Sequence, residues 1–365
     1  MAYSFYSPGN TTPRCNFEMV PSLEWKSSGL YNGLDPLIFH IQTDFDYDNI
    51  PDAIKGELQG IIPDEMIFQL IDFGAVYFRP AGTHKTKKPK RTTPEKSSLP
   101  LQKGSYVRVS ANPKCYPHFW DVGDWKSLII FESDDLLAVN KPAGCPTTET
   151  ADNIVENVRK KLERTLGYND GKRKLEVASR LDIGTEGLLL FAKTPRATSM
   201  LNSAFRNRTV TKKYRLRCRK KPSQLSGSVI HSWNIPERKN SMPVLLSSAG
   251  EKTKRQVELE ILSCEQSRHV HPDTKEHMWL AEVELKTGLT HQIRLQFSAL
   301  GAALNGDTRY SPVEGLLLDE GEEVEFGKVV ESRVDLQCFS LEFQDGDLPS
   351  GAPTIFELPP PVWYE

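Results

Sequence analysis

A short polar loop holds the side chains of this chain that are best suited, by type and spacing, to chemistry. It runs over Ser179–Gly187, carries Arg180 and Asp182 two residues apart, and leads into the apolar run Leu188–Ala192, which has the length of a strand. A carboxylate at the mouth of a buried strand is held rigidly at the edge of a cleft, where it can act on a substrate. The alternative is that Asp182 is a turn residue whose carboxylate bonds its own backbone.

The size and composition describe a globular protein with room for two or three domains. The chain has 365 residues, of which 38% are hydrophobic and 26% charged. It contains no apolar run as long as a membrane span, and its N-terminal stretch lacks the features of a secretory signal. Six scattered cysteines without a CxxC pair argue against a disulfide framework. We therefore expect a protein of a reducing compartment, in the cytoplasm, the nucleus or an organelle, without a membrane partner.

The net charge of −2 hides a local asymmetry. Basic residues gather at 85–91 and again at 206–221, whereas acidic residues gather near both ends of the chain. A balanced total with basic patches fits an enzyme that binds a polyanion on one face. A solvated surface run is the alternative, and it is favoured for 85–91, which also holds Pro and Thr.

The hydrophobic patterns predict an α+β chain with a mixed, mainly antiparallel sheet and flanking helices. The expected helices are one that Gly74 ends, one from a cap at Asp152 to Leu166, and one opened by Thr194-Pro195. The expected strands are 75–78, 104–109, 128–131, 136–139, 188–192, 214–218, 257–262, 279–285 and 336–343. A polar loop is expected between the strands 257–262 and 279–285.

The N-terminal region shows a helix followed by two strands, "LIDFGAVYF" and then "LQKGSYVRV". This order resembles the small ribosomal-protein-S4-type RNA-binding domain, with a basic insertion between about 80 and 98. An unrelated helix and hairpin is the alternative. The expected organisation is an unassigned extension over 1–60, an S4-like domain over 61–115 and a catalytic domain over 120–365.

Five separated segments combine polar and glycine residues beside predicted strands. They read "VNKPAG", "SRLDIGTEGLLLFAKT", "VTKKYR", "LKTGLTHQIRLQFSALGAALNGDTRY" and "DLQCFSLEF". In this order they resemble the successive motifs of the RluA-type RNA pseudouridine synthases, from about Leu128 to Phe343. A single short motif is a weak signal, but five motifs in order are specific. The resemblance implies the pseudouridine synthase fold and an isomerase of RNA.

The resemblance also implies three catalytic residues and one arginine that inserts into the RNA stem. Asp182 is the catalytic acid of the family, and a carboxylate can attack or shield an electron-poor sugar carbon without a metal. Arg294 matches the arginine that pairs with this Asp and keeps it ionised. Tyr214 matches the tyrosine that lies against the target base. Arg180 matches the arginine that enters the helix stack when the base is flipped out.

Further residues beside these motifs are expected to bind substrate: Lys141, Lys213, Arg215, Thr290, His291 and Gln292. Alternatives stay open for two of them, because Lys141 could simply end its strand and His291 could be a packing residue. Alternation along the strand predicts that Tyr214 and Leu216 share one face, with Lys213 and the arginines on the other.

Three positions depart from the family pattern. Ser179 stands where the family usually has His, Glu186 where it has Ser, and Leu289 where it has Arg. The last two changes make the potential near an RNA cleft less positive, which puts substrate affinity or choice in doubt.

These observations predict an RNA pseudouridine synthase, monomeric, without cofactor or metal, that acts on structured rRNA, tRNA or mRNA. Cys264, His269, His271 and His277 lack the tight, paired spacing of a zinc site. One rival is an RNA-binding protein that keeps the fold without turnover. Another is a glycoside-cleaving enzyme, but such enzymes typically use two carboxylates and a single acid stands out in this chain.

Overall fold

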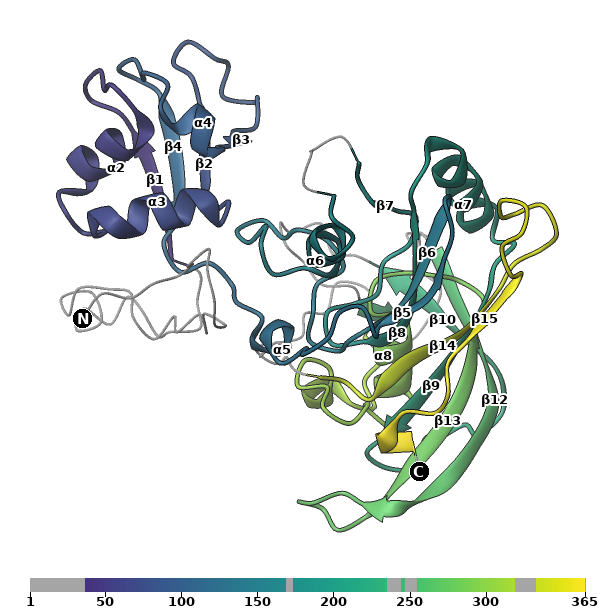
Figure 1. The fold of residues 1–365 in the computed structure, drawn as a ribbon. Helices are drawn as coiled ribbons and strands as arrows, with labels where there is room; N and C mark the ends of the chain where they lie inside the picture. The colour runs from purple at the N-terminus through teal and green to yellow at the C-terminus, as the bar shows by residue number, and fades with distance from the viewer. Residues whose placement is uncertain (1–36, 169–172, 235–243, 247–254, 319–332, 365) are drawn as a thin grey trace. The chain divides into compact units, whose positions relative to one another are not determined.

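The computed structural model describes residues 37–168, 173–234, 244–246, 255–318 and 333–364 (Figure 1). These residues form two compact units. The first contains the described chain up to Asp121 together with Thr148–Lys161, and the second contains Val122–Thr147 together with the described chain from Leu162 onward. Of the helices in these described ranges, none combines the length and the apolar character that a bilayer span requires.

The first unit is a small sheet with two helices on one face. Its strands lie in the order β1 (Ile38–Gln42), β4 (Tyr106–Ser110), β2 (Val76–Arg79) and β3 (Lys90–Arg91), all antiparallel. The helices are α2 (Ile50–Leu58) and α3 (Asp64–Asp72), and two short ones follow, α4 (Pro94–Ser97) and α5 (Pro117–Trp120). Apolar side chains of β1, β2 and β4 pack against α2 and α3 in one core. Gly74, with φ of 78°, lies between α3 and β2, as the sequence predicts.

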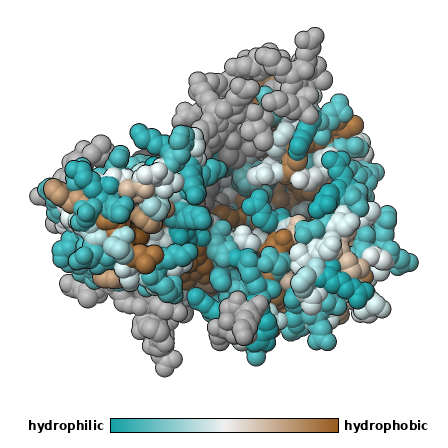
Figure 2. All heavy atoms as spheres, turned by 90° about the horizontal axis from the view of Figure 1, so that it is seen from above, coloured by the Kyte–Doolittle hydropathy of each residue, from teal (hydrophilic) through white to brown (hydrophobic). Residues whose placement is uncertain are grey.

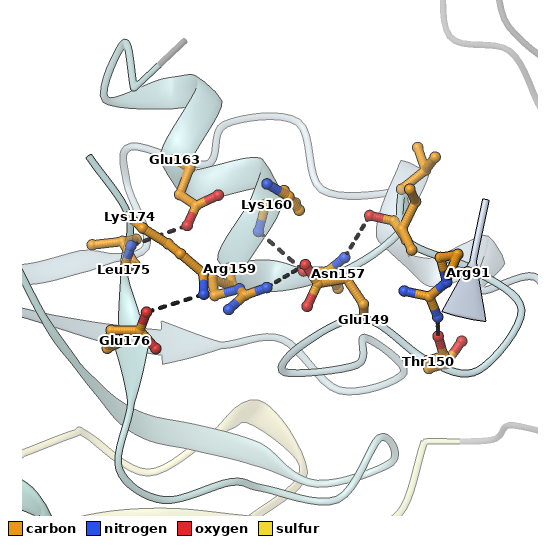
Figure 3. Close-up of polar contacts among 12 residues, drawn as sticks. Arg91, Glu149, Thr150, Asn157, Arg159, Lys160, Glu163, Lys174, Leu175 and Glu176 are labelled. Atoms are coloured by element: carbon orange, nitrogen blue, oxygen red, sulfur yellow. Dashed lines mark hydrogen bonds and ion pairs between the residues drawn. The ribbon is translucent and has the colours of Figure 1, made fainter. Parts of the chain in front are cut away.

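The helix expected to begin at Asp152 begins later, so that prediction is wrong. Helix α6 spans Val158–Thr165. The side chain of Asn153 accepts hydrogen bonds from the amides of Val155 and Glu156, and that of Asn157 accepts one from Lys160 (Figure 3). Asn153 therefore stabilises a turn before the helix, and Asn157 caps the N-terminus of the helix itself.

The second unit is built on an eleven-stranded sheet within the described residues (Figure 1). The main order is β11-β10-β12-β13-β9-β14-β8-β6-β5, with β15 beside β14 and β7 beside β8. The strands are β5 (Ile129–Glu132), β6 (Leu136–Lys141), β7 (Glu176–Val177), β8 (Glu186–Ala192), β9 (Thr211–Cys218), β10 (Gly227–Asn234), β11 (Val244–Leu246), β12 (Arg255–Val270), β13 (His277–Leu285), β14 (Leu336–Glu342) and β15 (Ile355–Glu357). The β14–β8 pair is parallel and the others are antiparallel, so the predicted mixed, mainly antiparallel sheet is confirmed.

Two helices complete this unit, α7 (Pro195–Asn207) and α8 (Gln292–Ala299). Thr194 caps α7 by accepting a hydrogen bond from the amide of Ala197, which confirms the predicted start. Helix α8 is buried from Gln292 to Ser298, so it lies inside the unit. Two short 3₁₀ turns, η2 (Ser311–Val313) and η3 (Val362–Tyr364), follow later in the chain.

The polar loop expected between 262 and 279 is mostly strand, so that prediction is wrong. Strands β12 and β13 continue as one long hairpin, with register shifts at Ile261/Ser263 and Gln266/Val270. Cys264 and His269 therefore lie on β12 and His277 on β13. Polar residues occupy these positions because much of this part of the hairpin faces solvent. Hydrophilic residues also cover most of the described surface on the face in Figure 2.

Candidate active site

The loop that carries Asp182 is fastened by its own backbone carbonyls. The carbonyl of Leu181 accepts from the Thr147 hydroxyl, and that of Asp182 accepts from the amide of Thr185. The carbonyl of Ile183 accepts from the amide of Gly144 at 2.7 Å and from the Lys141 ammonium at 3.2 Å. Because successive carbonyls are bonded, the carboxylate of Asp182 projects from a backbone with little freedom to move.

A glycine lets β8 and β14 meet directly beside this loop. Gly187 has φ of 118°, and a Cβ at this position would lie 2.3 Å from the backbone oxygen of Cys338. No other residue fits, since both the conformation and the space exclude a side chain. The parallel pairing of Glu186 and Gly187 with Gln337 and Cys338 therefore fixes the end of the loop.

His291 lies beside Asp182 as a neutral ring. Its Nε2 is 3.8 Å from Oδ1 of Asp182, and its Nδ1 hydrogen-bonds the hydroxyl of Tyr310 at 2.9 Å. Burial lowers the pKa of His291 to about 4, although the Asp182 carboxylate opposes this shift. The imidazole is thus uncharged at neutral pH. The Asp182 side chain remains 27% exposed, so a substrate can reach it.

The arginine expected to pair with Asp182 is instead clamped by a different carboxylate. Arg294 donates from Nε to Oδ2 of Asp307 at 2.7 Å and from Nη2 to Oδ1 at 2.9 Å. Burial disfavours the charge of Arg294, but the bonds and charge of Asp307 outweigh it and raise its pKa. The fork of the guanidinium matches the carboxylate at two points, which explains the preference for Asp307. Asp182 contributes a favourable charge to Arg294 without a hydrogen bond among the described contacts.

Tyr214 lies on the buried face of β9, next to the same group of residues. Burial and the neighbouring Cys338 raise its pKa well above that of a free phenol, and the Asp182 charge adds to the shift. The hydroxyl therefore stays protonated at neutral pH. Burial also raises the pKa of the Cys338 thiol to about 12, so this cysteine is a packing residue and not a nucleophile.

The predicted alternation along β9 is confirmed, and it places Lys213 and Arg215 on the face opposite Tyr214. Tyr214 and Leu216 are buried, whereas Lys213 and the arginines lie on the other face. Each of these basic residues has a carboxylate partner: Lys213 pairs with Glu342, Arg215 with Glu282 and Arg217 with Asp335. The Arg215 guanidinium also lies 3.9 Å from the centroid of the Phe339 ring. These ion pairs connect neighbouring strands of the sheet, and the expected contacts of Lys213 and Arg215 with substrate stay predictions.

Lys141 and Gln292 are also structural, contrary to the substrate contacts expected of them. Lys141 is 0% exposed, and its ammonium donates to three backbone carbonyls, those of Pro142, Cys145 and Ile183. Burial lowers the pKa of Lys141 to about 8. Gln292 is 2% exposed and joins Thr287, Leu289, Glu258 and Gln296 through its amide. Both side chains are thus buried and hydrogen-bonded within the protein.

Arg180 and Thr290 remain exposed beside the site, and no hydrogen bond or ion pair engages their side chains within the described ranges. The departures from the family pattern have defined surroundings too. Glu186 accepts a hydrogen bond from the indole of Trp363, and burial raises its pKa. Leu289 packs at the edge of an apolar cluster around Trp233 and Leu295, where an arginine would lie poorly.

Lys212, which belongs to the basic stretch 206–221 and to the segment VTKKYR, is a further candidate site residue. Lys212 and Tyr214 are two residues apart on β9 and therefore share a face. Burial lowers the pKa of Lys212. Its ammonium lies 3.1 Å from where a Cβ of Gly288 would be, so Gly288 leaves the space that this amine occupies. Asp307 and Tyr310 support Arg294 and His291 directly.

Comparison with known proteins finds similarity to RNA pseudouridine synthases. The family model for RNA pseudouridylate synthase matches residues 135–299. "RNA pseudouridine synthase 6, chloroplastic" of Arabidopsis thaliana is 32% identical over 222 residues, covering 57% of this chain and 45% of that protein. "Ribosomal large subunit pseudouridine synthase C" of Rickettsia felis is 32% identical over 186 residues, covering 51% of this chain and 56% of that protein. The chain thus spans about half the length of these curated relatives.

Among solved structures, human RNA pseudouridylate synthase domain containing 1 matches with a TM-score of 0.47 and 21% identity, covering 66% of this chain and 85% of that one. The sequence family and the mixed sheet are sufficient to define a pseudouridine synthase fold. Over residues 135–299 the chain is similar to the RNA pseudouridine synthases.

Proposed function

We propose that this chain is an RNA pseudouridine synthase that isomerises uridine to pseudouridine, with Asp182 as the catalytic residue. The observation that carries the proposal is the placement of this carboxylate. It is partly exposed, on a loop whose carbonyls are fastened, and beside a buried tyrosine, a neutral histidine and a clamped arginine. A rigid carboxylate in this setting can attack or shield the sugar while the freed base rotates and rejoins through carbon 5.

Three neighbours have distinct proposed roles. Tyr214 stacks against the target base as a neutral phenol, because its raised pKa works against a phenolate base. Arg294, while hydrogen-bonded to Asp307, supplies positive electrostatic potential to the Asp182 carboxylate. Arg180, exposed two residues before Asp182, fills the gap that the flipped nucleotide leaves in the stem.

Lys212 joins these residues as a proposed substrate contact. Its partly buried ammonium lies on the Tyr214 face of β9 and has no hydrogen bond or ion pair to another described residue. A cation that loses hydration without a protein partner gains most from an anionic ligand. The phosphate of the target nucleotide is such a ligand. Thr290 and His291 are proposed to contact the substrate as well, since His291 lies beside Asp182 and Thr290 is exposed next to it in the sequence.

The class of RNA, the cellular compartment and the role of the first unit are also part of the proposal. The relative from Rickettsia is named as a synthase of the large ribosomal subunit, which supports rRNA as a first candidate among rRNA, tRNA and mRNA. The relative from Arabidopsis is named as chloroplastic, which supports an organelle beside the cytoplasm and the nucleus. The N-terminal sheet and helices are proposed to be an S4-like RNA-binding domain, and the chain is proposed to act as a monomer.

Incubation of the purified chain with RNA from cells that lack its gene tests the proposal. Nucleoside analysis should show new pseudouridine without free uracil. Release of free uracil would instead indicate a glycoside-cleaving enzyme. RNA binding without any new pseudouridine would favour the alternative, an RNA-binding protein that keeps the fold without turnover.

A further inference from the structure

The first unit carries a second cluster of chemistry, on the open face of its small sheet. One face of this sheet packs on α2 and α3 through Ile41, Val107 and Val109. The side chains that alternate with these point to the other face. Arginines and tyrosines dominate it, and we name it the Arg–Tyr face: Tyr77 and Arg79 on β2, Arg91 on β3, and Tyr106 and Arg108 on β4.

Strand register arranges these side chains as a checkerboard. Tyr77 is opposite Arg108 on one side and Arg91 on the other, and Arg79 is opposite Tyr106. The guanidinium of Arg108 lies 4.1 Å from the centroid of the Tyr77 ring, and that of Arg79 lies 4.8 Å from the centroid of the Tyr106 ring. Each of these two cations therefore lies over a tyrosine ring, which restricts its position before any ligand arrives.

The arginines of this face have no carboxylate partner among the described residues. Arg79 donates to the carbonyls of Lys85 and Lys87, and Arg91 donates to that of Thr150 (Figure 3). Arg108 makes no hydrogen bond within the described ranges, and its Nε is buried without a partner. Arg91 also donates to the Tyr77 hydroxyl and to the carbonyl of Ala151. Arg79 and Arg108 keep further guanidinium donors without a partner among the described residues. This contrasts with the arginines of β9, which are all paired with acids.

Charge is segregated between the two sides of the first unit. The four strands contain no Asp or Glu, and the loop between β2 and β3 adds exposed lysines at 85, 87 and 88. Acidic side chains gather instead on α2, α3 and the loop before them: Asp44, Asp46, Asp48, Asp52, Glu57, Asp64, Glu65 and Asp72. A polyanion is thus attracted to the sheet and repelled by the helices.

We propose that the Arg–Tyr face binds a single-stranded segment of RNA, which rests on the proposed function in that RNA is the substrate. Guanidinium planes and tyrosine rings present π-faces on which bases stack without sequence preference, and the free guanidinium donors bind phosphates. An acidic peptide would use the charges and leave the aromatic planes unused. The combination of both favours RNA over a simple anion.

Binding of the full-length chain to a short, fluorescently labelled oligouridylate tests this proposal. The double variant Arg79→Gln with Arg108→Gln should weaken binding about tenfold or more and lower the slope of log affinity against log salt by roughly one, as expected when about two phosphate contacts are lost. Tyr106→Leu should weaken binding about fivefold or more while leaving the slope unchanged, because it removes stacking only. Lys55→Gln, on the helix side, should bind like the wild type.

Two further comparisons keep the outcome decisive. Arg79→Lys with Arg108→Lys preserves the charge and should keep the salt slope but lose affinity, since an ammonium offers no plane for stacking. Unchanged binding in the glutamine variant would overturn the proposal, as would an equal loss of binding to a polyglutamate peptide. Failure of the proposed function would look different: the wild type would form no pseudouridine, whatever its affinity for oligouridylate.

Discussion

Asp307→Asn removes the charge that holds Arg294 while it keeps the shape of the side chain. Asp307 is 2% exposed and accepts four hydrogen bonds, two from the Arg294 guanidinium and two from the amides of Arg309 and Tyr310. Arg294 is 8% exposed, so it would remain a buried cation without its bidentate partner. Breaking a buried ion pair from one side costs about 3–5 kcal/mol of unfolding free energy.

Thermal unfolding by circular dichroism measures this cost. For a unit of this size we expect the Tm to fall by roughly 10 °C. Asp64→Asn is the matched control, because Asp64 pairs with Lys55 at an exposed site, where solvent screens the ion pair and its loss costs little. Arg294→Met combined with Asp307→Asn should recover part of the loss, since no unpaired charge remains. A single Asp307→Asn variant as stable as Asp64→Asn would refute the clamp.

The remaining predictions concern three other residues. Arg215→Ala should lower the unfolding free energy by about 1–2 kcal/mol, because it removes the ion pair with Glu282 and the contact with the Phe339 ring. The affinity for RNA should stay unchanged. A loss of RNA affinity without a loss of stability would show instead that Arg215 contacts RNA. His291→Gln should reduce the loss of stability at acidic pH. In the unfolded chain His291 takes up a proton near pH 6.5, but in the folded protein it does so only near pH 4. The wild type therefore loses up to about 3 kcal/mol of unfolding free energy as the pH falls from 6.5 to 4, and the variant lacks this loss. Equal pH dependence of the two proteins would contradict a neutral His291. Lys212→Met should leave the Tm unchanged or raised and lower kcat/KM by about tenfold, the effect of one lost charged contact. An unaltered kcat/KM would remove Lys212 from the site.

Local patterns in the sequence were sufficient for much of the fold. The alternation in Thr211–Cys218 predicts which side chains of β9 are buried, and Thr194-Pro195 predicts the start of α7. Predictions failed where side chains compete with the pattern. The periodic residues after Asp152 suggest a longer helix, but Asn153 and Asn157 bond the local backbone first. Side-chain capping of this kind depends on geometry that periodicity does not contain.

The candidate site was predictable in its residues but not in their pairing. The motif around Asp182 could be identified from sequence, and the structure brings His291 and Tyr214 next to it. The partner of Arg294 could not be read from sequence, because Asp182 and Asp307 are both within reach of a guanidinium in the folded chain and the geometry selects between them. The role of Lys141 was hidden for the same reason, since its three acceptors are backbone carbonyls.

The rate of pseudouridine formation by Asp182→Asn tests the central claim most directly. Asn keeps the size of the side chain and removes the charge, and the carbonyls that fasten the loop are backbone groups that the substitution leaves in place. Tritium release from labelled uridine RNA should fall to background, while the Tm and the affinity for RNA stay close to those of the wild type. Turnover near the wild-type rate in a correctly folded Asp182→Asn protein would show that another group does the chemistry.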